Sequence, residues 1–472
     1  MVAQPGFRRS LSRAKLGSID AGRMPHGENG EADERTGLLG RLENGDASHK
    51  LSIRDFFLNK SHTPGEQSPN KFVRASAQGW NVTKVTLFSN YVNILLVFVP
   101  LGMVAGAMSW NPTTVFILNF FAIVPLAALL SFATEEISLK LGQTMGGLLN
   151  ATFGNAVELI VSIVALTKGE IRIVQSSMLG SILSNLLLVL GCCFLAGGIT
   201  NTTEGTALGI EQDFNMTVAS TMSSLLSVAA ASLIIPATLY AALSKSKEAT
   251  EGNILTLSHG TAIILLVLYV LYIFFQLKTH SHLFDGEAAD NEEQEVPQMS
   301  PWAAGTILIV VTLLVAVCAE FLVDSIESVV ETMHISKTFI GLILLPIVGN
   351  AAEHVTAIVV ALKDKMDLAM GVAIGSSMQI ALLVTPALVI LGWIIGQPMT
   401  LHFETFETVV FFLSVLVVTY VLQDGKSNFL EGAMLLGLYF IIALAFLVYP
   451  DDASDGLGKS SIIEGAGAVV GM

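Results

Sequence analysis

Charged residues are scarce in this sequence. They make up 13% of the 472 residues, whereas an ordinary soluble domain contains about 25%. Hydrophobic residues make up 52% of the chain, and the mean hydropathy is +0.66. This composition excludes a soluble globular enzyme and indicates an integral membrane protein.

Cysteine is scarce as well. Cys192, Cys193 and Cys318 all lie within apolar runs, so neither a disulfide framework nor a thiolate metal site has the ligands it needs. A nucleotide site is also missing. The Gly-Lys-Ser segment at 458–460 is the one hint of a P-loop, but Ala453 stands where that pattern needs its first glycine. The sequence therefore argues against an ATP-driven pump.

Basic residues are fewer than acidic ones, and the difference lies in the apolar part of the chain. The totals are 24 Lys and Arg against 39 Asp and Glu, for a formal net charge of −15. Residues 1–84 hold 13 basic and 9 acidic residues, so 11 basic and 30 acidic residues follow them. Because a carboxylate in hydrocarbon is costly and usually functional, the acidic residues inside apolar runs are the first candidates for a site.

Apolar stretches of membrane-spanning length follow one another from residue 91 onward. Each is close to the roughly 20 residues that a helix needs to cross the bilayer. The sequence therefore predicts an all-α integral membrane protein with eleven transmembrane helices. They lie near residues 91–109, 113–133, 146–166, 173–197, 216–243, 254–277, 303–326, 339–362, 368–396, 406–423 and 429–449.

The polar segments divide the chain into six regions. Residues 1–84 are rich in Ser, Gly, Asn and mixed charge, which predicts a disordered cytosolic tail. The remaining regions are an unpaired transmembrane helix (85–110), a first five-helix repeat (111–280), an acidic linker (281–300), a second five-helix repeat (301–450) and a luminal tail (451–472). The linker lacks the spacing of an EF-hand loop, so a charged connection is favoured over a calcium sensor.

The basic residues between the spans favour a cytosolic N-terminus. With that orientation nine Lys and Arg flank the spans on the cytosolic side and six on the other side. Cytosolic loops carry an excess of basic residues in most membrane proteins. We therefore expect the N-terminus in the cytosol and the C-terminus on the opposite side of the membrane.

An internal repeat is the most informative feature of the sequence. The segment Gly-Asn-Ala-Val-Glu at 154–158 recurs as Gly-Asn-Ala-Ala-Glu at 349–353, and the Gly-Ser pair at 180–181 recurs at 375–376, both at an offset of 195. The first motif falls on the third predicted span and the second on the eighth. Five spans separate them, so the two halves are expected to cross the membrane in opposite directions, as in many secondary transporters.

The repeated motif places one carboxylate in each half beside an expected break in a helix. Gly154 and Gly349 supply the interruption, helped by Pro346, and the opened turns would expose backbone carbonyls as cation ligands. Together with Ser and amide side chains of the next span, these groups can form an all-oxygen, doubly anionic cage, which suits calcium. The candidate ion-binding residues are Glu158, Glu353, Asn155, Asn350, Gly154, Gly349, Ser181, Ser376, Gln379 and Asn185.

Each candidate also has a structural interpretation. Glycine in a membrane helix commonly serves close packing, and Ser or Asn commonly makes hydrogen bonds between helices. For Ser181, Asn185, Ser376 and Gln379, ligand and packing interpretations are both open. A purely structural role for Glu158 and Glu353 is disfavoured, because acidic residues at matched positions within two apolar spans are rare.

These residues resemble a known family. The segments 150–160 and 179–191, with 349–354 and 375–380 in the second half, look like the two alpha repeats of the cation/proton exchangers of the calcium/cation antiporter superfamily. The fungal vacuolar calcium/proton exchangers are the members that they resemble most. The resemblance implies one unpaired helix followed by two inverted five-helix halves, an acidic segment between the halves, and a location in the vacuolar membrane.

The resemblance also implies an activity. It is secondary active transport of Ca²⁺ out of the cytosol into the vacuole, in exchange for luminal H⁺, by alternating access. Glu158 and Glu353 become shared Ca²⁺ and H⁺ sites, Asn155 and Asn350 ligands, and Ser181, Ser376 and Gln379 part of the cavity wall. His354 breaks the repeat symmetry, because Leu159 stands at its counterpart.

The remaining expectations concern the ions and the partners. His354 either modulates proton binding or acts as a hydrogen-bonded spacer, which is slightly favoured. Mn²⁺ is an alternative transported ion, and Na⁺ or K⁺ coupling and a passive cation channel are the alternative functions. We expect no catalytic residues and no cofactor. The expected partners are the lipid bilayer, Ca²⁺ and H⁺, and no nucleic acid; nothing in the sequence predicts an oligomeric state.

Overall fold

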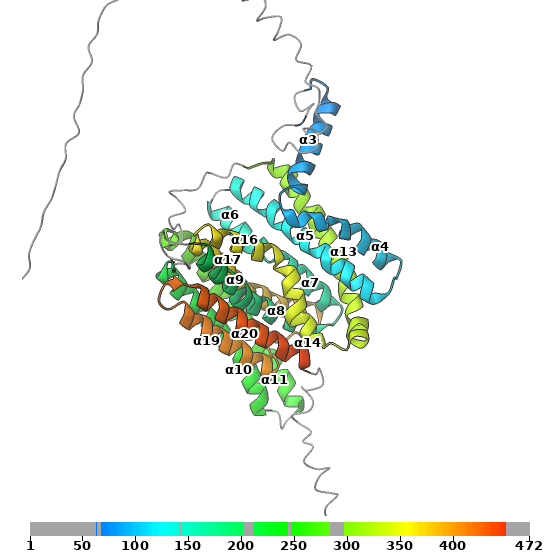
Figure 1. The fold of residues 1–472 in the computed structure, drawn as a ribbon. Coiled ribbons are helices and arrows are strands. Elements are labelled where there is room, and N and C mark those ends of the chain that lie inside the picture. The colour runs from blue at the N-terminus through cyan, green and yellow to red at the C-terminus, as the bar shows by residue number, and fades with distance from the viewer. Residues whose placement is uncertain are drawn as a thin grey trace, which may run out of the picture. The chain divides into compact units, whose positions relative to one another are not determined.

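The computed structural model describes residues 63, 68–141, 143–201, 211–243, 247–283 and 297–449. Most of the predicted N-terminal tail, most of the acidic linker and the whole luminal tail lie outside the described residues. Apart from the two-residue strands β1 (Gln212–Asp213) and β2 (Lys426–Ser427), which pair antiparallel, the described elements are helices (Figure 1). A nearly all-helical fold follows from the composition, because a helix satisfies its own backbone hydrogen bonds in lipid.

The end of the predicted tail is helical. Helix α3 (Lys71–Leu87) begins at Asn70, whose side chain accepts a hydrogen bond from the backbone N–H of Phe72. The prediction of disorder is therefore wrong for residues 71–84. The segment lacks the apolar periodicity of a core helix, but the Asn cap satisfies one of the free donors of its first turn, and Ala77 and Val85 are buried.

Seven described helical segments are long and apolar enough to cross a membrane, and two bent pairs raise the number to nine. The pairs are α3 with η1 (Tyr91–Val97) and α4 (Phe98–Ala107), bent by 107°, and α14 (Lys337–Phe339) to α15 (Leu345–Gly349) with α16 (Ala351–Leu362), bent by 58°. Two shorter apolar helices are α7 (Ala156–Thr167) and α19 (Thr405–Val421). The predicted number of eleven is reached when these are counted too, and it stays a prediction.

The seven long segments include several with a π-helical turn. They are α5 (Pro112–Leu141), α8 (Ile171–Leu183) continued by η2 (Ser184–Val189) and α9 (Leu190–Thr200), α10 (Met216–Leu243), α11 (Lys247–Phe274) with η3 (Phe275–Thr279), α13 (Pro301–Met333), α17 (Met366–Gln379) continued by η6 (Ile380–Val384) and α18 (Thr385–Ile395), and α20 (Phe429–Val448). The remaining described helices are α6 (Gln143–Phe153), η4 (Ser281–Leu283) and η5 (Ile340–Leu344).

Backbone irregularities recur at the repeat offset. Asn155 precedes α7 and Asn350 precedes α16, each directly after a break. The π-helical segments η2 and η6 end at Val189 and Val384. Both pairs are 195 residues apart, which is the offset of the sequence motifs. Because π turns inside long helices occur often at functional sites, these irregularities direct attention to the elements around the breaks.

Close packing brings the breaks together. Helix α8 lies against η5, and a Cβ atom added at Gly180 would overlap the backbone of Leu342, while one added at Gly341 would overlap Ser176. Glycine at both positions lets the two helical backbones approach. Helices α5 and α13 pack against each other along their lengths, beside α7 and α15 (Figure 1). Helices α7 and α8 therefore lie side by side with η5 and α15 at the two breaks.

Candidate functional site

Each candidate carboxylate lies in the first turn of a helix that starts at a break. Glu158 belongs to α7 and Glu353 to α16. Glu158 is 6% exposed, and the preceding residues Asn155 and Asn350 are 1% and 0% exposed. The N-terminus of a helix carries a partial positive charge and free backbone N–H groups, both of which stabilise a nearby carboxylate. The broken helices therefore give the buried Glu158 and the partly buried Glu353 a polar local environment.

The two carboxylates lie against each other's breaks. A methyl group added at Gly349 would stand 2.6 Å from Glu158 Oε1, and one added at Gly154 would stand 3.7 Å from Glu353 Oε1. The same position at Gly154 is 3.8 Å from Gln379 Oε1. Gly349 is therefore the residue that makes room for the acidic side chain of the first motif. At Gly154 the tightest contact is with the backbone O of Asn150, 2.9 Å from an added methyl group, and Glu353 is in ordinary van der Waals contact.

A hydrogen-bond chain joins four of the predicted residues across the two halves. Asn185 Nδ2 donates to Ser376 Oγ at 3.0 Å, and Ser376 Oγ donates to Asn155 Oδ1 at 2.8 Å. Asn155 Nδ2 then donates to Gln379 Oε1 at 2.7 Å. The packing interpretation of Ser376, Gln379 and Asn185 therefore has direct support, and the same contacts hold their oxygen atoms beside the breaks.

Several buried polar atoms at the breaks have no hydrogen-bond partner among the described residues. They are both side-chain heteroatoms of Asn350, Glu353 Oε2 and Asn185 Oδ1. Buried polar groups are satisfied in the great majority of cases, so unpaired ones need a reason. Three of these four atoms are oxygens, which are the ligands that a hard cation prefers. Within the described part of the chain no three His, Cys, Asp or Glu side chains converge, so any ligand set here must include amide, hydroxyl or backbone oxygens.

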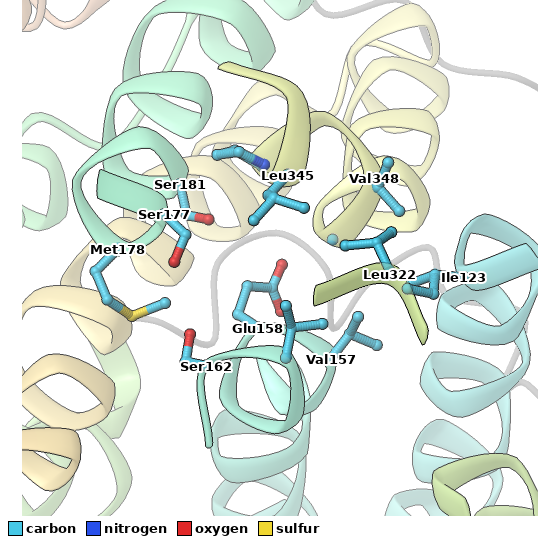
Figure 2. A pocket seen from close by; sticks show the side chains of 13 residues that line it. Ile123, Val157, Glu158, Ser162, Ser177, Met178, Ser181, Leu322, Leu345 and Val348 are labelled. Atoms are coloured by element: carbon cyan, nitrogen blue, oxygen red, sulfur yellow. The ribbon is translucent and has the colours of Figure 1, made fainter. Parts of the chain in front are cut away.

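Glu158 also borders a cavity that the sequence only partly predicted. Figure 2 shows its side chain among the hydroxyl groups of Ser162, Ser177 and Ser181, within otherwise apolar walls. Ser181 was a predicted residue, whereas Ser162 and Ser177 were not. A helical-spacing signal was available, because Ser162 follows Glu158 by four residues and Ser177 precedes Ser181 by four.

His354 is hydrogen-bonded within the core. Its Nε2 atom lies 3.2 Å from Ser184 Oγ, and Ser184 is fully buried on η2. Ser184 and Gln379 are 195 residues apart, so the residue that meets His354 is the repeat counterpart of a candidate ligand. This contact agrees with the spacer interpretation of His354, and its influence on proton binding stays a prediction.

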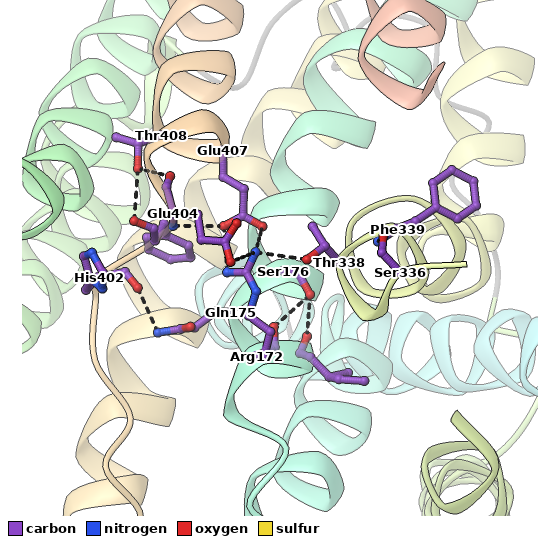
Figure 3. Close-up of polar contacts among 12 residues, drawn as sticks. Arg172, Gln175, Ser176, Ser336, Thr338, Phe339, His402, Glu404, Glu407 and Thr408 are labelled. Atoms are coloured by element: carbon purple, nitrogen blue, oxygen red, sulfur yellow. Dashed lines mark hydrogen bonds and ion pairs between the residues drawn. The ribbon is translucent and has the colours of Figure 1, made fainter. Parts of the chain in front are cut away.

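A buried ion-pair network joins three helices and was not predicted. Arg172 donates to both carboxylate oxygens of Glu407, at 2.6 and 2.9 Å, and to Thr338 Oγ1 at 3.1 Å. Glu404 adds a contact at 3.1 Å, and the Glu407 side chain is 0% exposed (Figure 3). Burial and the positive charge of Arg172 lower the pKa of the nearby His402. Arg172 and Glu407 are 235 residues apart, so no local pattern reveals the network.

Comparisons with known proteins agree with this geometry. The model of the sodium/calcium exchanger protein family matches residues 111–278 and 304–448, which lie within the predicted repeat bounds. A vacuolar calcium ion transporter of Schizosaccharomyces pombe is 54% identical over 369 residues, covering 78% of this chain and 87% of that protein. Vacuolar cation/proton exchanger 2 of Arabidopsis thaliana is 44% identical over 384 residues, covering 80% and 85%.

Solved structures show the same fold. The crystal structure of the selenium-substituted Ca²⁺/H⁺ antiporter protein YfkE is similar with a TM-score of 0.64 and 38% sequence identity. The match covers 76% of this chain and 99% of that one. The helical fold is therefore shared with a solved protein over nearly the full length of that protein.

Proposed function

Because this chain belongs to the sodium/calcium exchanger protein family, we propose that it moves Ca²⁺ from the cytosol into the vacuole in exchange for luminal H⁺. The chain is a transporter and not an enzyme. Its relatives are named vacuolar calcium ion transporters and vacuolar cation/proton exchangers. Those names, together with the apolar helices, support a multi-pass protein of the vacuolar membrane.

The observation that carries the proposal is the crossed arrangement of the two motifs. Glu158 stands against Gly349 and Glu353 against Gly154, so both negative charges face the region where the broken helices meet. In our proposal Glu158 and Glu353 are the shared Ca²⁺ and H⁺ sites. The other members of the site are Asn155, Asn350, Ser181, Ser376, Gln379, Asn185 and the backbone at Gly154 and Gly349.

Competition for the carboxylates couples the two ions. An ionised glutamate contributes a negative charge and oxygen ligands to Ca²⁺, whereas a protonated one is neutral and holds a cation poorly. Calcium and protons therefore exclude each other from the same groups. Exchange follows if the protein changes the accessible side only when the site is loaded with Ca²⁺ or with protons.

Helices α5 and α13 are the proposed moving elements. They pack along each other, and the Glu136 carboxylate near the end of α5 accepts hydrogen bonds from the backbone N–H groups of Gln298 and Met299, just before α13. Lys168, directly after α7, pairs with Asp324 on α13. The contacts between α5 and the start of α13 support a unit of these two helices that slides or rocks against the helices that carry the carboxylates. The Lys168–Asp324 pair joins this unit to α7, so such a movement would have to break it.

The membrane layout is part of the same proposal. We propose eleven spans, with one unpaired helix and two inverted five-helix repeats, and a cytosolic N-terminus. The breaks and π-helical segments at the common offset of 195 support the repeat. In this orientation the loops near Lys168 and His334 face the vacuolar lumen.

Calcium flux into proteoliposomes with an imposed pH gradient tests the function. Wild type is expected to accumulate Ca²⁺ when the interior is acidic, and Glu158→Gln or Glu353→Gln is expected to abolish the accumulation, because each removes an anionic site. Glu211→Gln is the control, since Glu211 pairs with Lys426 on an exposed surface and such pairs contribute little. Full uptake in either site variant would refute the assignment.

The same preparation separates the alternatives. Sodium or potassium gradients in place of the pH gradient would drive calcium uptake by a Na⁺- or K⁺-coupled exchanger. A passive channel would let Ca²⁺ follow its own gradient after the pH gradient is collapsed. Competition by Mn²⁺ measures whether that ion is also transported.

A further inference from the structure

The cavity beside Glu158 extends away from the break. On α7, Ser162 lies one turn beyond Glu158, toward Lys168, and on α8, Ser177 lies one turn before Ser181, toward the start of the helix. Both serines border the same cavity as Glu158, and Figure 2 shows their hydroxyl groups directed toward the space that its side chain enters. Relative to Glu158, both serines therefore lie on the side of the cavity that is nearer to Lys168.

The hydroxyl group of Ser162 lacks a partner. Ser162 is 1% exposed, and its Oγ atom makes no hydrogen bond to any described residue. A buried helical serine commonly bonds to a carbonyl one turn earlier, as Ser177 does with Val174 O at 3.0 Å. The other side chains around the cavity are largely apolar, including Ile123, Val161, Leu322 and Leu345. An unpaired hydroxyl in such walls indicates a polar occupant.

The two serines belong to one half of the repeat only. At the offset of 195, Ala357 stands at the position of Ser162 and Val372 at the position of Ser177. By contrast, Ser181 has Ser376 as its counterpart. The extra hydroxyl groups are therefore specific to the side of Glu158 and are not a general property of the motif.

We propose that Ser162 and Ser177 form a second cation station, which holds a partly hydrated divalent cation between Glu158 and the Lys168 end of the assembly. The proposal rests on the exchange function above. The hydroxyl groups supply uncharged oxygen ligands, and Glu158 supplies one negative charge. Ca²⁺ takes 6 to 8 oxygens in flexible geometry, so an ion here keeps part of its water. The station lets the ion lose or regain its hydration in steps.

The two interpretations of Ser162 and Ser177, a cation station and a packing role, differ in the side of the membrane on which the calcium dependence of transport changes. In the proposed orientation Ser162 and Ser177 lie on the luminal side of Glu158, so the station acts on luminal calcium. Vacuolar vesicles with the cytosolic face outward give both directions: uptake reports cytosolic calcium, and efflux from calcium-loaded vesicles reports luminal calcium. For the double variant Ser162→Ala/Ser177→Ala we expect the luminal calcium concentration at half-maximal efflux to rise about fivefold, which is the effect of losing one weak ligand. The cytosolic calcium concentration at half-maximal uptake should change by less than about twofold.

Two further variants complete the test. Ser162→Thr keeps the hydroxyl group and is expected to stay within about twofold of wild type. Ser414→Ala removes a fully buried serine that donates to Val410 O on α19, and is expected to leave both values unchanged. An equal shift in both directions, no shift, or a shift confined to uptake would each overturn the station. Absence of proton-driven uptake in wild type would instead refute the exchange function.

Discussion

The two halves of the chain share their backbone breaks and differ in the side chains around them. Asn155 and Asn350 stand at equivalent breaks, and both are followed three residues later by a glutamate. Yet Asn155 is hydrogen-bonded to Ser376 and Gln379, whereas Asn350 has no partner among the described residues. The comparison teaches that the common backbone places the ligands, while each half surrounds them with its own chemistry.

The difference is greater in the first turns of α8 and α17, the helices that follow the broken ones. Arg172 forms the buried network with Glu407, and its counterpart at the offset of 195 is Asp367. Asp367 accepts a hydrogen bond from the backbone N–H of Asn215 at 2.7 Å in an exposed location. The first turn of this helix therefore meets a different neighbour in each half, and four sets of substitutions can test how far the halves differ.

Arg172→Gln is expected to have the largest effect. It leaves the fully buried Glu407 without its positive partner, and breaking a buried pair costs about 3–5 kcal/mol. Asp367→Asn, at the equivalent position, is expected to cost less than about 1 kcal/mol, because its contact is exposed. Thermal unfolding in detergent measures both, and the double variant Arg172→Gln/Glu407→Gln should recover part of the loss. Equal stability of the two single variants would remove the contrast.

The paired asparagines are expected to separate stability from binding. Asn155→Ala breaks two hydrogen bonds and should destabilise the calcium-free protein by about 1–3 kcal/mol. Asn350→Ala removes a buried side chain that has no hydrogen-bond partner in the described part of the chain, so the free energy of unfolding of the calcium-free protein should change by less than about 1 kcal/mol. Its stabilisation by added calcium should fall, since a ligand stabilises only the form that it binds. Thermal melting curves at graded calcium concentrations measure both effects. Similar losses of stability in the two calcium-free variants would contradict the prediction.

The two motif glycines are expected to differ in calcium affinity. At Gly349 the added methyl group would stand 2.6 Å from Glu158 Oε1, so Gly349→Ala must displace that carboxylate and should raise the calcium concentration at half-maximal uptake about tenfold. At Gly154 the added methyl group would stand 3.7 Å from Glu353 Oε1 and 2.9 Å from the backbone O of Asn150. Gly154→Ala therefore presses on the backbone of the break and leaves the carboxylate in place, so it should raise that calcium concentration only about two- to threefold. Uptake assays over a range of calcium concentrations test whether Gly349→Ala has the larger effect. A larger effect of Gly154→Ala would show instead that Glu353 is the more confined carboxylate.

The smallest effect on uptake is expected at His354, whose counterpart in the first half is Leu159. Gln at position 354 can still hydrogen-bond to Ser184, whose Oγ atom lies 3.2 Å from His354 Nε2. His354→Gln should therefore change uptake by less than about twofold and leave its pH profile in place. A shifted pH profile would show that the imidazole modulates proton binding. His354→Leu, which copies the first half, then measures what the hydrogen bond itself contributes.

The candidate site was largely predictable because it repeats. Two acidic motifs at one offset identified Glu158 and Glu353, and the glycines and asparagines followed from their place in the motifs. Ser162 and Ser177 were missed because they have no counterparts in the second half, so the search for self-similarity did not select them. Helix α3 was missed for a different reason: its residues have a mixed polar composition, and the burial of Ala77 and Val85 depends on neighbouring elements.

The sequence by itself determined the class of molecule, the positions of the breaks and the two carboxylates within apolar segments. These follow from local properties: apolar length, glycine and asparagine at a helix interruption, and the cost of a charge in hydrocarbon. Only the tertiary structure decided that each carboxylate stands against the glycine of the other motif. It also decided that Arg172 meets Glu407 across 235 residues. Such contacts depend on how distant helices pack, and helical periodicity along a single span carries no information about its partner in space.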